Sequence, residues 1–273
     1  MKRFFTSKIF FFAFLLIFNW LTPNAVFPQL FSFEEVTTTD ARTLAMGNPH
    51  ALSREFTNPA YLSFLSEYKV SASLHNRFQM SELNTSGLRF VLPNKFIDAG
   101  FQFSHFGYQD YNFLSFQTGL AKQINERFSI GSKINLTYLN NFLDEHAQTG
   151  VKVGIGGVYQ LSEPVRICLL AENIASTSNE KDYSLHFGLD YQCLPNLNLS
   201  SEISYNFEKQ INLSLGAEYQ IIDELFFRAG FRTYCSIPSL GAAYTFKNIE
   251  IGIAFTSHRT LGGSSMIEIG YKF

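Results

Sequence analysis

Most of this sequence alternates, residue by residue, between apolar and polar side chains. Beyond residue 66 the alternation comes in stretches separated by turn-forming residues. Successive side chains of a β-strand point to opposite faces, so each stretch predicts a strand with one apolar and one polar face. Each stretch is close to the roughly 9–11 residues that a tilted strand needs to cross a lipid bilayer. The pattern therefore favours a β-barrel that spans a membrane.

We expect fourteen such strands, and the alternation is clear at 248–258, where Ile249, Ile251 and Ile253 share one face. The predicted strands cover residues 67–76, 84–92, 97–106, 111–122, 127–139, 147–160, 164–173, 182–192, 196–206, 209–220, 225–234, 237–246, 248–258 and 263–273. Short links alternate with mostly longer ones, as in barrels with short periplasmic turns and longer outer loops. The predicted fold is an all-β, 14-stranded antiparallel transmembrane β-barrel over residues 67–273.

The last ten residues place Ile267, Ile269, Tyr271 and Phe273 on one face of the final strand. A strand that ends the chain with an aromatic residue resembles the assembly signal of bacterial outer-membrane barrels. We therefore expect Phe273 to be read by the machinery that inserts such barrels. A strand of a soluble β-sandwich could alternate in the same way, but it would have no need of this terminal ring.

The composition agrees with a wall that has lipid on one side and water on the other. Charged residues make up 16% of the chain and aromatic residues another 16%, including 30 Phe and 13 Tyr. Mean hydropathy is +0.00, as expected when half of each strand faces lipid. The net charge of -2 gives no basic surface for nucleic acid, so no nucleic-acid partner is expected.

Residues 1–29 resemble a signal peptide. Lys2, Arg3 and Lys8 precede an apolar run at 9–21, which is shorter than the roughly 20 residues of a membrane-spanning helix. We expect cleavage between Ala25 and Gln29, although a buried amino-terminal helix is an alternative interpretation. The expected location is the outer membrane of a Gram-negative bacterium, with membrane lipid as one partner.

No catalytic or metal-binding pattern is evident in the sequence. Cys168, Cys193 and Cys235 lack the close spacing of metal ligands, so we expect three unpaired thiols, no bound metal and no cofactor. Ser184 and His186 share a strand face, but no acid that would orient the histidine can be identified from the sequence. The sequence therefore predicts a protein that is not an enzyme.

A short repeat, Gly-x-x-Tyr, occurs four times near the ends of even-numbered predicted strands. A fifth tyrosine, Tyr271, lies at the corresponding place in the last strand, also on the apolar face. Amphipathic rings prefer the membrane–water interface, and membrane barrels carry girdles of such rings. The predicted girdle, at the periplasmic interface, consists of Tyr159, Tyr191, Tyr219, Tyr244 and Tyr271.

Residues 30–66 do not alternate, and we expect them to form a plug inside the barrel. Thr39 or Asp40 could cap a short helix at 41–46 that Gly47 ends, and a tight turn should follow at 58–60. The apolar residues here include Leu44, Met46, Leu52, Phe56, Tyr61, Leu62 and Phe64, which would form a costly exposed patch in water. A periplasmic tail that docks on a partner is the alternative.

The predicted polar faces of the strands carry charges of both signs, which Arg42, Arg54 and Glu55 of the plug could meet. An ordinary water-exposed lumen with cross-strand ion pairs would show the same pattern, as would a selective pore. The charged or titratable residues expected to point inward are Lys133, Lys152, Arg166, Glu172, His186, Asp190, Glu202, Glu218, Arg228, Arg232, Glu250, Glu268 and Lys272.

The plug segment also resembles a known family. Ala-Arg-Thr-Leu-Ala-Met-Gly at 41–47 and Asn-Pro-Ala-Tyr-Leu at 58–62 resemble the start of mature FadL-like barrels, most closely the PorV/PorQ branch of the type IX secretion system. The motif residues are Met46, Gly47, Asn58, Pro59 and Ala60. The sequence departs from the family pattern at 48–50 and at 53–56.

This resemblance implies a 14-stranded barrel with an amino-terminal plug, and two alternative functions. The first is an accessory barrel of protein secretion that binds envelope or secretion-system proteins, as PorV and PorQ do. The second is a FadL-like outer-membrane transporter of hydrophobic small molecules. Polar inward residues favour the first function, whereas an apolar lining that leads to a lateral gap would favour the second.

Overall fold

The computed structural model describes residues 40–108, 111–141, 147–177, 183–206 and 210–273. The predicted signal peptide at 1–29, and residues 30–39 of the predicted plug, lie outside these described residues. Among the described residues, no helix is long and apolar enough to cross a membrane.

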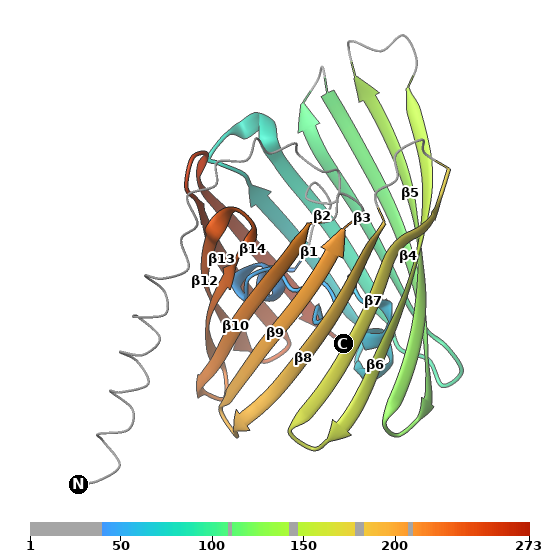
Figure 1. Ribbon diagram of the computed structural model, residues 1–273, viewed down its shortest axis with the longest axis vertical. Helices are drawn as coiled ribbons and strands as arrows, with labels where there is room; N and C mark the ends of the chain where they lie inside the picture. The colour runs from blue at the N-terminus through green and yellow to red at the C-terminus, as the bar shows by residue number, and fades with distance from the viewer. Residues whose placement is uncertain (1–39, 109–110, 142–146, 178–182, 207–209) are drawn as a thin grey trace, which may run out of the picture. The chain divides into compact units, whose positions relative to one another are not determined.

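Fourteen antiparallel strands form a closed barrel, as the alternation predicted (Figure 1). Their bounds are β1 Lys69–Asn76, β2 Asn84–Leu92, β3 Asp98–Tyr108, β4 Tyr111–Asn125, β5 Phe128–Asn141, β6 Gln148–Ser162, β7 Val165–Ser176, β8 Ser184–Leu194, β9 Leu197–Asn206, β10 Ile211–Ile222, β11 Leu225–Arg232, β12 Ile237–Phe246, β13 Ile249–His258 and β14 Gly262–Lys272. Each strand pairs with its neighbours in the chain, so every connection joins adjacent strands.

The first and last strands close the barrel. β1 pairs with β14 along its whole length, from Lys69 opposite Lys272 to Asn76 opposite Ser265. The pairing continues past the strand, since the Phe273 backbone N–H donates to the Tyr68 carbonyl at 2.9 Å. Closure satisfies the backbone groups that an open sheet would leave unpaired at its edges, and the interior of a bilayer requires this.

The two faces of the wall differ in chemistry as the alternation predicted. On β13, Ile251 and Ile253 are 43% and 52% exposed on the outside, whereas Gly252 and Ala254 are buried on the inside. The same contrast holds around the barrel, where outward positions carry large apolar side chains and inward positions carry most of the buried polar ones.

Several strand bounds differ from the prediction by one to three residues. β11 ends at Arg232 rather than 234, because a 3-10 helix, η4 Tyr234–Ser236, takes over with positive φ angles at Cys235 and Ser236. Positive φ is incompatible with the extended ladder. A second 3-10 helix, η3 Ser81–Leu83, lies within the link between β1 and β2 and was also not predicted.

Within residues 40–68, two short helices precede the first strand. α2 Ala41–Ala45 begins where predicted, because the Asp40 side chain accepts a hydrogen bond from the Thr43 N–H. Gly47, with φ +87, follows its end. The predicted turn at 58–60 is instead the start of a 3-10 helix, η2 Pro59–Phe64, because the Asn58 side chain accepts from the Ala60 N–H and caps it.

Replacing Ile253 by arginine should test which face meets lipid. At mid-strand on the outward face, a charge should cost about 2–4 kcal/mol of folding free energy in a bilayer. Ile249→Arg, on the same face but at the strand end, should cost only about 0–1 kcal/mol. Unfolding in lipid vesicles measures both, and equal costs at the two depths would contradict the assignment of faces.

Candidate functional site: a segment on the inner wall

Residues 40–66 lie against the inside of the barrel. Helix α2 contacts strands β11 to β14, and helix η2 contacts β3 to β6 (Figure 1). Met46, Leu52, Phe56, Tyr61 and Leu62 are almost completely buried, although they belong to no strand. The segment thus runs around the inner wall from the last strands of the chain toward the first ones.

A row of glycines on the inner wall makes room for this path. A Cβ atom added at these glycines would fall within 3 Å of the segment in each case. The pairs, with the distance from that Cβ, are Gly241 to Ala45 Cβ at 2.5 Å, Gly216 to the Met46 carbonyl oxygen at 2.7 Å, Gly188 to Leu52 Cγ at 2.7 Å and Gly156 to Asn58 Oδ1 at 2.0 Å. These four are the glycines of the Gly-x-x-Tyr repeat.

The tyrosines of the repeat lie on the other side of the wall. Positions three apart in a strand point to opposite faces, so each inward glycine carries an outward tyrosine with it. The exposed fractions are 40% for Tyr159, 42% for Tyr191, 45% for Tyr219, 46% for Tyr244 and 42% for Tyr271. Phe273, at 68%, packs edge-on against Tyr271 with the ring centroids 5.0 Å apart. The repeat therefore places a glycine against the segment on the inner face and a tyrosine on the outer face of the same strand.

Arginines of the segment pair with carboxylates of the wall. Arg42 donates twice to the Glu218 carboxylate, at 2.9 and 3.0 Å, and Arg228 donates to the same carboxylate at 2.7 Å. Arg54 donates to Asp190 at 2.7 Å. The prediction that Arg42 and Arg54 pair with inward charges is thus confirmed.

Glu55 is the acidic counterpart. Its carboxylate accepts from Lys69 Nζ at 2.5 Å and also from the guanidinium of Arg89, which in turn contacts Glu268. Burial alone would raise the pKa of Glu55, but Lys69 and Arg89 outweigh it, and the pKa lies below the usual range. Glu55 therefore stays ionised at neutral pH, and its stabilising charge is lost only in strong acid.

Backbone groups of the segment are bound by buried carboxylates as well. Glu268 accepts from the Ala41 N–H at 2.7 Å. Glu202, 2% exposed, accepts from the N–H groups of His50 at 3.1 Å and Ala51 at 2.6 Å. These carboxylates fix the position of the segment's main chain, and no sequence pattern predicted that they would bind backbone rather than side chains.

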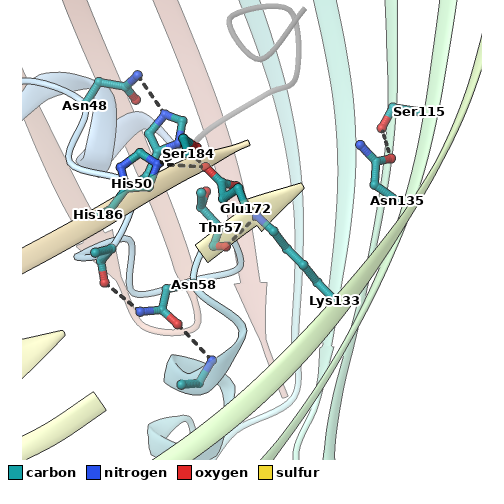
Figure 2. Close-up of polar contacts among 12 residues, drawn as sticks. Asn48, His50, Thr57, Asn58, Ser115, Lys133, Asn135, Glu172, Ser184 and His186 are labelled. Carbon is teal, nitrogen blue, oxygen red and sulfur yellow. Dashed lines mark hydrogen bonds and ion pairs between the residues drawn. The ribbon is translucent and has the colours of Figure 1, made fainter. Parts of the chain in front are cut away.

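A cluster of two histidines and a glutamate joins the segment to β7 and β8 (Figure 2). His50 Nδ1 lies 2.8 Å from Glu172 Oε2, and His186 Nε2 lies 3.3 Å from the same oxygen. Lys133 Nζ donates to the other Glu172 oxygen and, at 2.8 Å, to the Thr57 carbonyl. The sequence prediction missed this cluster, because His50 and Glu172 are 122 positions apart.

The acid that the sequence could not supply for Ser184 and His186 is Glu202. Ser184 Oγ lies 2.9 Å from His186 Nε2, and Glu202 Oε1 lies 3.0 Å from His186 Nδ1. This is the order of groups in a hydroxyl–imidazole–carboxylate triad. However, Ser184 is only 2% exposed, so the hydroxyl cannot reach a substrate carbonyl from solvent. The arrangement holds the histidine in place rather than forming an accessible nucleophile.

Further side-chain contacts hold η2 against the inner wall. The Tyr61 hydroxyl lies 3.1 Å from Cys168 Sγ, and burial raises the pKa of Tyr61 well above its usual value, so the hydroxyl stays neutral. The Arg166 guanidinium lies 5.6 Å from the Tyr61 ring centroid and 5.2 Å from that of Phe64. All three cysteines are free thiols, as predicted.

A separate apolar patch lines the inner wall near the end of β3, the start of β4 and the end of β5. Phe106 of β3, Phe113 of β4 and Leu139 of β5 are cross-strand neighbours and are all buried. Leu83 and Tyr111 pack against them, and the Arg77 guanidinium lies 5.6 Å from the Phe106 ring centroid. This patch differs from the charged inner wall around residues 40–66.

No protein-family model matches the chain, and no curated protein matches it. Solved structures do. A FadL homologue of Pseudomonas aeruginosa superposes with a TM-score of 0.62 at 10% identity, covering 87% of this chain and 98% of the homologue. The toluene transporter TodX of Pseudomonas putida gives 0.61 at 13% identity, covering 84% and 95%. CymD, a monoaromatic hydrocarbon channel, gives 0.60 at 14%, covering 85% and 97%.

The fold is that of FadL-like barrels. The similarity extends over nearly the full length of these proteins, of which TodX is a toluene transporter and CymD a monoaromatic hydrocarbon channel. The fold predicted from alternation and from the motif at 41–62 is thereby confirmed, although the identities speak for architecture alone.

Gly230→Ala should displace the segment without unfolding the barrel. The new Cβ would lie 2.2 Å from Gly47 N and from the Met46 carbonyl carbon, and such overpacking costs about 1–3 kcal/mol. We expect faster proteolysis within residues 40–66 and unchanged heat-modifiable migration on gels. Gly157→Ala is the matched control, since its nearest neighbour would be 3.8 Å away. Equal proteolysis of the two variants would contradict the contact.

Proposed function

We propose that this protein is an outer-membrane barrel through which a hydrophobic small molecule passes, with residues 40–66 as a plug in its path. The observation that carries the proposal is the fold, shared over most of the chain with a toluene transporter and a monoaromatic hydrocarbon channel. The inward patch of Phe106, Phe113 and Leu139 supports it, because such a surface suits an apolar solute better than an ion.

The outward surface supports a location in the outer membrane. Its apolar side chains would face lipid, the five tyrosines would form the periplasmic girdle, and Phe273 would serve as the assembly signal. A largely apolar pocket of about 590 Å³, lined by Phe227, Leu240, Ile253 and their neighbours, spans β11–β14 and β1 and offers a place where an apolar molecule could meet the wall.

The plug role rests on the packing of the segment. Between Arg42, Glu55, Lys69 and Glu268 the remaining cavity is only about 10 Å³, too small for a solute. Met46 and Gly47 lie on the wall at β10 and β11, and Asn58, Pro59 and Ala60 lie on it at β5 and β6. With the segment in this position, passage of a solute through this part of the lumen would require the segment to move.

A role as an accessory component of protein secretion, as in PorV and PorQ, is the second candidate. It rests on the motif at 41–62, and it is favoured by the ion pairs between Arg42, Arg54, Glu55 and the wall, which leave this part of the interior polar. In that case the partners would be envelope or secretion-system proteins, and the barrel would not need to conduct anything.

Two measurements on the purified protein test these functions. In planar bilayers the intact protein should carry little steady current, whereas a variant lacking residues 30–66 should show large, unselective openings. Vesicles containing the intact protein should take up a monoaromatic hydrocarbon, used as the probe, faster than protein-free vesicles. Phe113→Arg should slow this uptake, and Phe116→Leu, which keeps the outward face of the same strand apolar, should serve as the control.

The outcomes separate the candidates. General porin currents from the intact protein would contradict the plug. Hydrocarbon uptake equal to that of protein-free vesicles, together with recovery of secretion proteins on the barrel from outer membranes, would replace the transport function with the accessory one.

A further inference from the structure

The cluster of His50, Glu172 and His186 brings three potential metal ligands together at the contact between the segment and the wall (Figure 2). One ligand atom from each residue lies within 4.8 Å of the other two. Glu172 is 7% exposed and His186 is 8% exposed, and His50 is covered by the stacked ring of His186, with the ring centroids 5.1 Å apart.

The surroundings of His186 turn one of its ring nitrogens toward the cluster. Glu202, an acceptor, lies 3.0 Å from Nδ1, so this nitrogen carries a proton. Nε2 lies 3.3 Å from Glu172 Oε2 and 2.9 Å from the Ser184 hydroxyl, and an ion bound through Nε2 would replace the contact with Ser184. A carboxylate that holds the second nitrogen of a histidine is the usual outer shell of a metal-bound imidazole.

The surroundings of His50 lead to the same arrangement. Asn48 Nδ2 lies 3.2 Å from His50 Nε2, while Asn48 Oδ1 is buried without a hydrogen-bond partner. The oxygen and nitrogen of an amide are assigned by their hydrogen bonds, and turning this amide over gives Oδ1 a donor in His50 Nε2–H. His50 Nδ1 then presents a lone pair to Glu172 Oε2, 2.8 Å away.

Two imidazole nitrogens and a carboxylate oxygen at this separation can share one cation. Lys133 supplies one charge, but it is bound to the other Glu172 oxygen. One divalent ion would bind all three atoms at once, in place of the N–H groups that otherwise join the two rings to the carboxylate. We propose that His50, His186 and Glu172 bind a divalent transition-metal ion such as Zn²⁺, which links the segment to the barrel wall.

The chemistry of the ligands selects this class of ion. Two imidazoles and one carboxylate are a common Zn²⁺ set, and ligand distances of about 2.0–2.2 Å keep the ligand atoms a little over 3 Å apart. The observed separations of 2.8 and 3.3 Å are close to this. Ca²⁺ and Mg²⁺ prefer oxygen ligands and suit the site less well. The ion would add a point of attachment between β7, β8 and the segment.

Metal titration of the full mature barrel in detergent, after treatment with a chelator, tests the proposal. Co²⁺ is the spectroscopic probe, and Zn²⁺ is the competitor. We expect one Co²⁺ per chain, with the visible absorption of a low-coordinate site that Zn²⁺ abolishes. His50→Gln and His186→Gln should lose this signal, and Glu202→Gln, which weakens both the outer shell of His186 and the hold on the His50 backbone, should weaken binding about 10–100-fold.

His75→Gln is the control, because His75 is a buried inward histidine of β1 outside the cluster, and this variant should bind like the unmodified protein. His50 lies outside the strands, so its variant keeps the barrel even if His186→Gln does not fold. Zn²⁺ should also slow proteolysis of residues 40–66 in the unmodified protein and not in His50→Gln. Absence of stoichiometric binding, or unchanged binding in His50→Gln, would overturn the proposal.

Discussion

The structure depends on the neutralisation of charges that the inner wall buries. Glu202, Glu218 and Glu268 are each less than one-tenth exposed, and an ionised carboxylate in such a place is unfavourable unless it is paired. Arg228, Arg89 and His186 of the wall provide part of the pairing. Residues 40–66 provide the rest, through the Arg42 side chain and through the backbone N–H groups of Ala41, His50 and Ala51.

The segment and the wall are also complementary in shape. Where the segment passes, the wall carries glycine, and a residue of the segment fills the space; the pairs are Gly156 with Asn58, Gly188 with Leu52, Gly216 with Met46 and Gly241 with Ala45. Because the same repeat turns a tyrosine outward, one four-residue pattern carries information for the interior and for the lipid surface together.

Alternation sufficed to predict the strands, since burial on one face and lipid on the other impose a period of two over most of the chain. The helix α2 that begins after Asp40 could be predicted because Asp is a favourable N-cap residue. The partners of Arg42, Arg54 and Glu55 could not be predicted, because they depend on the path of a non-repetitive segment past strands far away in sequence. Glu202 became the partner of His186 only through the β8–β9 register, which sets His186 opposite Ser204 and Glu202 opposite Gly188. Short-range patterns do not specify such diagonal contacts.

The path of the segment has a consequence for the order of assembly. Its first helix rests on β11 to β14, the strands made last, and its second helix rests on β3 to β6, made early. Contacts of such large sequence separation form late, since the intervening chain must first be ordered. We therefore expect the amino-terminal segment to complete its docking only after β11–β14 have formed, late in the assembly of the barrel.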